Sequence, residues 1–429
     1  MNDMFAEVIA PETSLRARGF AGFVASGRER RAPVRRAFAT GLGPDLWELE
    51  LHPVRSLEAL APDIEALVER AAEPNIFFTL PLLRAAFPRL ARMRGRTVGP
   101  IHFLALYRTR PEDEEERRRL VLFMPLAQPR LGWPGRACAM AAATEYTPLG
   151  TPLVADDVLE EAAERCLMLL ADPAMTLPAT LALPDSRSNG PVARAFAAAA
   201  AGLGLPQVAL QRRERAVHRA GDALALARKR VRDHARQLRR LGETGELTFH
   251  AARSESAVLD AFEAFMALEL ASWKGHRGSA LYNRKHIAAF SRQSVADLAR
   301  DGACAIHAMK LDGRTIASLI VLGDERTGFV TWKTAFDADH HAASPGVQIL
   351  LSATRDLDER LAPGTLVDSL AVADHPVMNR VWRGREPMET RLIGLTSRAG
   401  DEVERLAAAI RRRDRWRERA KSLRDAFPF

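Results

Sequence analysis

The sequence predicts a layered α/β protein of two tandem lobes, each a mixed, mostly antiparallel sheet flanked by helices, with additional basic helical segments. The chain has 429 residues, which is too long for one compact core. Its hydrophobic fraction of 47% is typical of globular proteins. Two long stretches also share one order of predicted elements: three strands, a helix, a strand, a helix and a strand.

Basic segments flank and separate the two predicted lobes. We expect a basic N-terminal arm at 1–40, a first lobe at 41–220, a basic helical connector at 221–246, a second lobe at 247–398 and a basic C-terminal helix at 399–429. Residues 212–240 carry eleven Arg or Lys against three acidic residues. No residue-level repeat accompanies the shared order, so a duplication is predicted from element order alone.

Hydrophobic spacing assigns the elements of the first lobe. Apolar residues three and four apart predict helices, whereas alternation and short apolar runs predict strands. The expected helices cover 57–71, 80–93, 156–171 and 190–204, and the expected strands cover 101–108, 119–127, 137–144, 180–184 and 206–217.

The same spacing rules assign the second lobe. The expected helices cover 258–273, 286–300, 345–361, 375–385 and, in the tail, 401–427. The expected strands cover 303–311, 314–322, 328–336, 365–372 and 388–395. In the first of these helices, Val258, Phe262, Phe265, Met266 and Leu270 are predicted to share the buried face.

Composition narrows the class of protein. Cys138, Cys166 and Cys304 lie far apart, so we expect a reducing compartment without disulfides or a zinc site. No secretory signal and no apolar run of roughly 20 residues is present, which predicts a cytoplasmic protein without transmembrane segments. The net charge of +8 favours anionic partners, although arginine-rich solvated surfaces give the same balance.

A helix start in the second lobe is a candidate phosphate site. In SPGVQ (344–348), Ser344 suits the N-cap and Pro345 the first helical position. The amides of Gly346, Val347 and Gln348 would then be unpaired and directed at the strand ends, where they and the helix dipole attract phosphate. An ordinary capped helix is the alternative.

Three polar residues on apolar elements are candidate catalytic groups. Lys333 lies in the strand FVTWKTAF, where we expect Trp332 and Lys333 on opposite faces; it would bind an anion, orient a nucleophile or extend from a sheet edge. Asp368 in VDSLAV is a candidate general base, or a structural partner of Lys333. His375 is a candidate acid or base, or a helix cap.

Trp273, Lys274 and Trp332 are predicted substrate contacts. Lys274 belongs to a basic glycine-bearing loop that would meet a phosphate or an acidic acceptor, with a solvated loop as the alternative. Trp273 is also expected to extend the apolar face of the preceding helix. The run DADHH (337–341) offers metal-type side chains without a spacing that collects them, so no metal site is expected.

Several short motifs, in a fixed order, resemble a known family. SWKG (272–275), DGRTIAS (312–318), WKTAFD (332–337), SPG (344–346), VDSLAVADHP (367–376) and NRVW (379–382) are similar to the CelD-like, cellulose-biosynthesis-type acetyltransferases of the GNAT superfamily, which are related to the FemAB transferases. The resemblance is best over 250–385. It extends more loosely to LPLL (80–83), TPLGTPLV (147–154) and RERA (213–216).

The resemblance implies two tandem GNAT-like lobes and an acyl donor, acyl-CoA such as acetyl-CoA, held by residues 344–348. It implies an N- or O-acyltransferase acting on a sugar, lipid-linked or amino acceptor in envelope or exopolysaccharide metabolism. SPGVQ is poorer in glycine than the usual loop of the superfamily. An aminoacyl-tRNA-dependent transferase, with tRNA on 212–240 and 411–424, is therefore an alternative, and a non-catalytic polyanion-binding scaffold is another.

Overall fold

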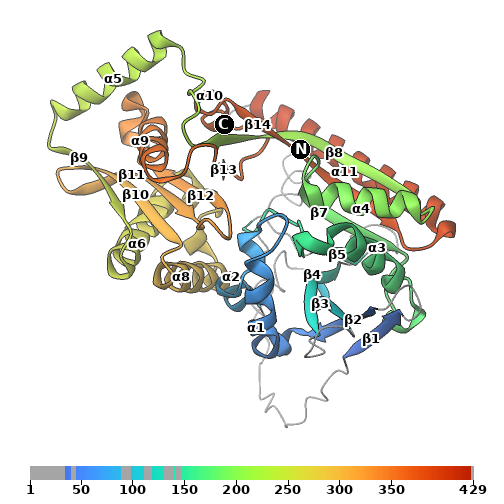
Figure 1. Cartoon of the computed structure of the whole chain (residues 1–429). Coiled ribbons are helices and arrows are strands. Elements are labelled where there is room, and N and C mark those ends of the chain that lie inside the picture. The colour runs from blue at the N-terminus through green and yellow to red at the C-terminus, as the bar shows by residue number, and fades with distance from the viewer. Residues whose placement is uncertain are drawn as a thin grey trace, which may run out of the picture. The chain divides into compact units, whose positions relative to one another are not determined.

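One mixed sheet runs through the part of the chain that the computed structural model describes, namely residues 34–39, 45–87, 98–110, 118–129, 139–141 and 146–426. Its strands follow the order β1-β2-β3-β4-β5-β7-β14-β8-β13-β12-β11-β10-β9, and β6 pairs with β4 (Figure 1). Buried apolar side chains from strands and helices of both halves form the main core. The layered α/β class is therefore confirmed.

The first lobe comprises the elements up to β8. Its strands are β1 (Arg35–Ala39), β2 (Leu46–Pro53), β3 (Val98–Thr109), β4 (Arg119–Pro129), β5 (Ala139–Ala141), β6 (Leu153–Val154), β7 (Thr180–Arg187) and β8 (Gln207–Arg219). Its helices are α1 (Leu57–Val68), α2 (Leu80–Ala86), α3 (Leu159–Leu170) and α4 (Pro191–Gly202).

The second lobe follows the basic helix α5 (Arg228–Gly242). Its strands are β9 (Leu247–Ala252), β10 (Cys304–Leu311), β11 (Arg314–Leu322), β12 (Phe329–Phe336), β13 (Leu366–Asp368) and β14 (Gly384–Gly394). Its helices are α6 (Glu255–Ala271), α7 (Trp273–His276), α8 (Lys285–Arg300), α9 (Pro345–Arg360), α10 (Met378–Val381) and the tail helix α11 (Gly400–Ala426).

The two lobes repeat one arrangement of strands. In the first, β3, β4 and β5 pair antiparallel and β5 then pairs parallel with β7, across the connecting helix α3. In the second, β10, β11 and β12 pair antiparallel and β12 pairs parallel with β13, across α9. The shared element order in the sequence therefore corresponds to a shared topology, because a parallel pair needs a long crossover between its strands.

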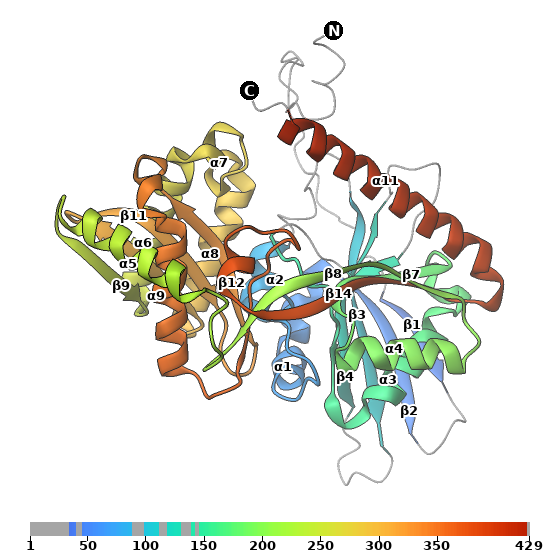
Figure 2. The same cartoon turned by 90° about the horizontal axis from the view of Figure 1, so that it is seen from above.

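The last strand of each lobe pairs with the other lobe. β8 pairs antiparallel with β13, and β14 pairs antiparallel with β7. β8 and β14 also pair with each other over most of their length (Figure 2). The strand expected at 388–395 within the second lobe is thus inserted between two strands of the first, and this exchange joins the lobes into one sheet.

Several expected boundaries are wrong. The helix expected at 375–385 is only Met378–Val381, and the strand β14 already begins at Gly384. The strand expected at 365–372 ends at Asp368, because Leu370 takes a left-handed backbone conformation (φ 52°) that strands do not accommodate. β1 lies within the expected arm and β2 was not predicted. Residues 1–33 of the arm and 88–93 of the expected helix 80–93 lie outside the described residues.

The strand exchange predicts that both lobes unfold together. Leu392 is fully buried in β14, where it lies opposite Ala182 of β7 and Val208 of β8. Leu392→Ala is expected to lower the free energy of unfolding by about 2–5 kcal/mol. Hydrogen exchange with mass spectrometry should show equal loss of protection in β3–β4 and in β10–β12, because β14 lies between β7 and β8 and connects the two halves of the sheet.

The control for this experiment is Leu270→Ala, which removes the same atoms from a side chain that is 37% exposed. It should leave both regions protected. Loss of protection confined to the first lobe in Leu392→Ala would show that the lobes fold independently.

Candidate functional site

The parallel strands β12 and β13 separate soon after they pair. Their pairing is confined to Phe329 with Val367 and Val330 with Asp368, although β12 continues to Phe336. The hydroxyl of Thr331 donates to the carbonyl of Ser369 at 3.1 Å, at the point where the strands part. Residues 332–336 therefore present a strand side without a neighbouring strand, which we call the open edge of β12.

Backbone direction along the open edge follows from its pairing with β11. The amide of Asp337 donates to the carbonyl of Ile316, and the residues of an antiparallel strand alternate between facing the partner strand and facing away. Thr334, which pairs with Leu319, consequently directs both its N–H and its C=O away from β11. The open edge thus offers a backbone donor and a backbone acceptor.

A β-bulge changes the faces of Trp332 and Lys333. The register with β11 shifts between Lys333 and Thr331, so that Trp332 is the extra residue of β12. Both neighbours then contact Tyr146: the indole N–H of Trp332 donates to the Tyr146 carbonyl at 2.8 Å, and the Lys333 ammonium lies 5.0 Å from the centre of the Tyr146 ring. The expectation that these two residues occupy opposite faces is wrong.

Lys274 reaches the open edge from helix α7. Its ammonium donates to the carbonyl of Thr334 at 2.7 Å and to the carboxylate of Glu269 at 3.1 Å. Glu269 is 1% exposed and also accepts the amide of Leu281 at 2.8 Å. A cation is therefore fixed beside the open edge, and the Lys274 side chain is held by two partners within the protein instead of being solvated.

Glu269 is a residue that the sequence reasoning missed. Helix α6 turns Glu269 inward, whereas Leu270, expected on the buried face, is 37% exposed. Trp273 is 49% exposed, with the Arg277 guanidinium 5.1 Å from its ring centre, so it does not extend the core. Glu269 follows the core residue Met266 by three positions, so it lies on the same face of the helix. This spacing is the sequence signal that would have indicated a buried carboxylate.

His375 caps the short helix α10. Its Nδ1 accepts the amide of Met378 at 3.2 Å, which assigns the neutral ring as the tautomer with the proton on Nε2. Burial and, secondly, the positive charge of Lys274 lower the pKa of His375 below its usual value. The ring is thus a neutral hydrogen-bond donor near Lys274, and its basic nitrogen is engaged by the backbone.

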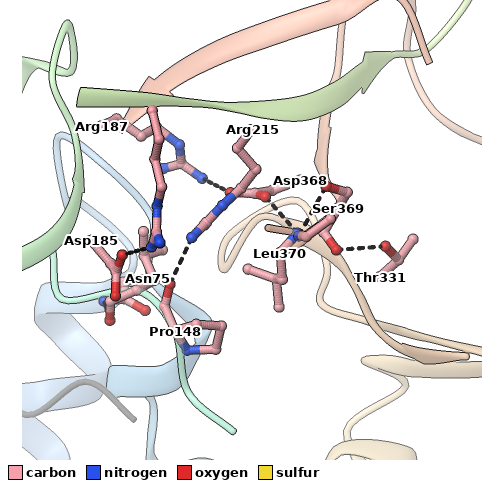
Figure 3. Close-up of polar contacts among 12 residues, drawn as sticks. Asn75, Pro148, Asp185, Arg187, Arg215, Thr331, Asp368, Ser369 and Leu370 are labelled. Atoms are coloured by element: carbon pink, nitrogen blue, oxygen red, sulfur yellow. Dashed lines mark hydrogen bonds and ion pairs between the residues drawn. The ribbon is translucent and has the colours of Figure 1, made fainter. Parts of the chain in front are cut away.

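Asp368 lies in a buried ion-pair network between the lobes (Figure 3). Its carboxylate is 3.2 Å from the guanidinium of Arg215 and 3.5 Å from that of Arg187, and it accepts the amide of Leu370 at 2.8 Å. Arg187 also donates to Glu73, whose pKa is raised by burial. The Asp368 carboxylate is thus paired with two arginines of the first lobe.

The start of helix α9 differs from the expected phosphate cradle. Ser344 takes a left-handed conformation (φ 52°) without a side-chain cap, and its carbonyl accepts the amides of Val347 and Gln348 at 2.9 and 3.1 Å. Gly346 is buried against Phe336, and the Gln348 amide group donates to the carbonyl of His234 in α5. Two of the three amides expected to be unpaired therefore have partners within the turn.

The two crossover helices differ in charge at their N-termini. Helix α9 has no acidic residue in its first turn, and the basic helix α5 is held beside it by the bond from Gln348 to His234. Helix α3, its counterpart in the first lobe, begins with Glu160 and Glu161 after Asp156 and Asp157. An anion is attracted to the positive end of a helix dipole and repelled by carboxylates, so only the second lobe favours a phosphate at this position.

A cavity of about 300 Å³ lies at the N-terminal ends of β12 and β13, where these two strands pair. Glu73, Arg187, Arg219, Val330 and Leu366 are among its lining residues, whereas the predicted substrate contacts Trp273, Lys274 and Trp332 are not. Among the described residues no group of three His, Cys, Asp or Glu side chains is placed to hold a metal ion. No helix of the described part of the chain has the length and apolarity that crossing a membrane requires.

The parted parallel strands, the crossover helix between them and the bulged strand give the second lobe a GNAT-like fold, and the first lobe repeats its strand topology. Residues 228–367 match the family model described as an acetyltransferase (GNAT) domain, which indicates an acyltransferase. No curated protein matches the chain.

Solved structures of low sequence identity are similar over most of the chain. The C-terminal domain (DUF2156) of a putative lysylphosphatidylglycerol synthetase from Agrobacterium fabrum is 15% identical, with 82% of this chain and 96% of that chain covered and a TM-score of 0.49. FemX is 12% identical, with 79% and 96% covered and a TM-score of 0.49. A tandem GNAT protein from the clavulanic acid biosynthesis pathway is 15% identical, with 82% and 99% covered and a TM-score of 0.36.

Proposed function

We propose that the protein transfers an acyl group from acyl-CoA, such as acetyl-CoA, to an amine or hydroxyl acceptor at the open edge of β12. The observation that carries this proposal is the backbone N–H of Thr334, directed away from β11 beside the fixed ammonium of Lys274. An acyl carbonyl oxygen that accepts this N–H lies near the Lys274 ammonium, because that ammonium is bonded to the carbonyl of the same residue, Thr334. Charge that develops on this oxygen is therefore stabilised in place.

The chemistry needs no further activation of the donor. The acceptor's lone pair attacks the thioester carbonyl carbon, and the tetrahedral intermediate carries its negative charge on the former carbonyl oxygen. The C–S bond then breaks, and the leaving thiolate takes up the proton that the acceptor loses, which gives free coenzyme A. Lys274 and the Thr334 N–H act on the oxygen, and the Nε2–H of His375 is a second neutral donor nearby.

We place the diphosphate of the donor at the first turn of α9, residues Ser344, Pro345, Gly346, Val347 and Gln348. The helix dipole, the absence of acids in this turn and the adjacent basic helix α5 support this placement. The amide of Gly346 and the hydroxyl of Ser344 are the proposed donors to the diphosphate, because the amides of Val347 and Gln348 already donate to the carbonyl of Ser344. Trp273 and Trp332 are proposed acceptor contacts.

The acceptor class is proposed from the motif resemblance. The CelD-like motifs favour a sugar, lipid-linked or amino acceptor in envelope or exopolysaccharide metabolism. An aminoacyl-tRNA donor is a second candidate, because α5 exposes Arg228, Lys229, Arg230, Arg232, Arg236, Arg239 and Arg240 close to the proposed donor site.

Calorimetry with coenzyme A tests the donor. The wild-type protein is expected to bind it, and Ser344→Asp is expected to weaken binding at least about tenfold, because a carboxylate then faces the diphosphate. Aspartate tolerates both the N-cap position and the left-handed conformation, so the helix should remain folded. Ser344→Asn, with the shape of aspartate and no charge, is the matched control and should lose much less affinity than Ser344→Asp, because its side-chain amide can still donate to the diphosphate.

Absence of coenzyme A binding in the wild-type protein would contradict the proposal. Equal affinities of Ser344→Asp and Ser344→Asn would contradict the placement of the diphosphate. Salt-dependent binding of aminoacyl-tRNA, with transfer of its aminoacyl group and no coenzyme A affinity, would establish the second candidate instead.

A further inference from the structure

The amides that follow β13 are occupied by side chains of the same turn. The carboxylate of Asp368 accepts the amide of Leu370 at 2.8 Å (Figure 3). The hydroxyl of Ser369 accepts the amide of Ala371 at 3.1 Å. Side chains that bond to nearby backbone amides compete with strand pairing. These two amides are therefore not available to extend the pairing of β13 with β12.

The backbone of this turn also leaves β12. Leu370 has a left-handed conformation (φ 52°), which is unfavourable for leucine and needs support from the surrounding structure. The amide of Ser369 donates to the carbonyl of Ala216 in β8 at 3.3 Å, and the carbonyl of Ser369 accepts the hydroxyl of Thr331. The chain after Asp368 thus stays with β8, while β12 continues without a neighbour.

Arg215 of the first lobe orients the carboxylate on which the turn depends. One oxygen of Asp368 lies 3.2 Å from the guanidinium of Arg215 and 3.5 Å from that of Arg187, while the other oxygen accepts the amide of Leu370. Arg215 is 2% exposed and Asp368 is fully buried. Because neither group is solvated, the ion pair holds the carboxylate in the orientation that caps Leu370.

We infer that Asp368 is a positioning residue that keeps the N–H of Thr334 accessible, and that Arg215 makes the first lobe part of the acyl-transfer site. The inference rests on the proposed function, in which this N–H binds the acyl oxygen. If β13 continued beyond Asp368, it would lie along the open edge, and its carbonyls would accept the N–H groups of β12, as parallel strands do. The acyl group would then be excluded from the edge.

Two double variants isolate the cap from the ion pair. Arg215→Met, Asp368→Asn and Arg215→Met, Asp368→Leu both remove the buried pair, but only asparagine can still accept the amide of Leu370. In the leucine variant this amide needs another acceptor, and the carbonyls of the open edge are the expected ones. Both variants should fold, because each removes both charges of the pair and Arg187 keeps its bond to Glu73.

Hydrogen exchange with mass spectrometry reports directly on residues 332–336. These residues should exchange at least about tenfold more slowly in the leucine variant than in the asparagine variant, because strand pairing protects amides. The kcat for acetyl-CoA thioester cleavage should be at least about tenfold lower in the leucine variant, because the donor to the oxyanion is covered. The affinity for coenzyme A should be the same in both variants, since the proposed donor site lies on α9.

A milder variant covers the case in which the leucine variant does not fold. Ser369→Ala releases only the amide of Ala371, so both measurements should change in the same direction by about threefold relative to the wild type. A purely structural role of the turn would instead lower activity without slowing exchange at residues 332–336.

The measurements fail separately. Equal exchange of residues 332–336 in the two double variants would overturn the inference, and so would slower exchange in the leucine variant with an unchanged kcat. If the wild-type protein cleaves no acetyl-CoA but the leucine variant still shows slower exchange, the proposed function is contradicted and the role of Asp368 in keeping the edge open is supported.

Discussion

Replacing Lys274 by methionine is expected to lower kcat for acetyl-CoA thioester cleavage about 10²–10³-fold, with little change in the affinity for coenzyme A. The expected size is that of removing one group that stabilises a developing oxyanion. Lys274 fits this role because its ammonium lies 2.7 Å from the Thr334 carbonyl, on the strand side to which the Thr334 N–H also points. Release of free thiol from acetyl-CoA is a direct measurement that does not require the acceptor to be known.

The design must separate lost charge from lost folding. Lys274→Met alone leaves the buried carboxylate of Glu269 without its cation, which is destabilising. The double variant Glu269→Gln, Lys274→Met removes both charges and keeps an oxygen for the amide of Leu281. Lys285→Met, at an exposed position, is the control for lysine removal. Wild-type turnover in a stably folded double variant would exclude Lys274 from the chemistry.

Asp368→Asn is expected to lower the free energy of unfolding by about 3–5 kcal/mol. Asparagine keeps the shape of the side chain and can still accept the amide of Leu370, but it leaves two buried guanidinium groups, those of Arg215 and Arg187, without this anion. Removal of one partner from a buried ion pair has an effect of this size. Urea unfolding followed by circular dichroism measures it.

Asp301→Asn, at an exposed position, is the matched control and should change the free energy of unfolding by less than about 0.5 kcal/mol. The experiment also decides between the two roles that the sequence left open for Asp368. A general base would give a variant that is as stable as the wild type but inactive. Stability within about 1 kcal/mol of wild type, combined with lost turnover, would contradict the structural role.

The relation between sequence and structure is clearest in the second lobe. The strands expected at 303–311, 314–322 and 328–336 and the helix expected at 345–361 agree with β10, β11, β12 and α9 within one residue at each end. Each of these elements buries one face against the core, so the spacing of its apolar residues shows whether it is a strand or a helix. The helix expected at 375–385 failed because a short capped turn and the start of a strand there have no period of their own.

The candidate site shows a different division. The residue types at the open edge were identified from the sequence, since a lysine beside a conspicuous turn and polar residues within apolar strands are visible as exceptions to a pattern. Their partners were not identified. Lys274 bonds to Glu269, five residues before it. Asp368 pairs with Arg187 and Arg215, which precede it by 181 and 153 residues. Trp332 donates to the carbonyl of Tyr146, which precedes it by 186 residues.

The sequence by itself determined the class of fold, the order of the elements and the basic character of α5 and α11, because propensity, periodicity and charge act over a few neighbouring residues. The tertiary structure alone decided that β8 and β14 exchange lobes, that a bulge turns Trp332 and Lys333 toward one tyrosine, and that the first turn of α9 engages two of its own amides. Strand pairing and ion pairing depend on which segments, far apart in the sequence, pack against each other in the folded protein. No local spacing specifies that choice.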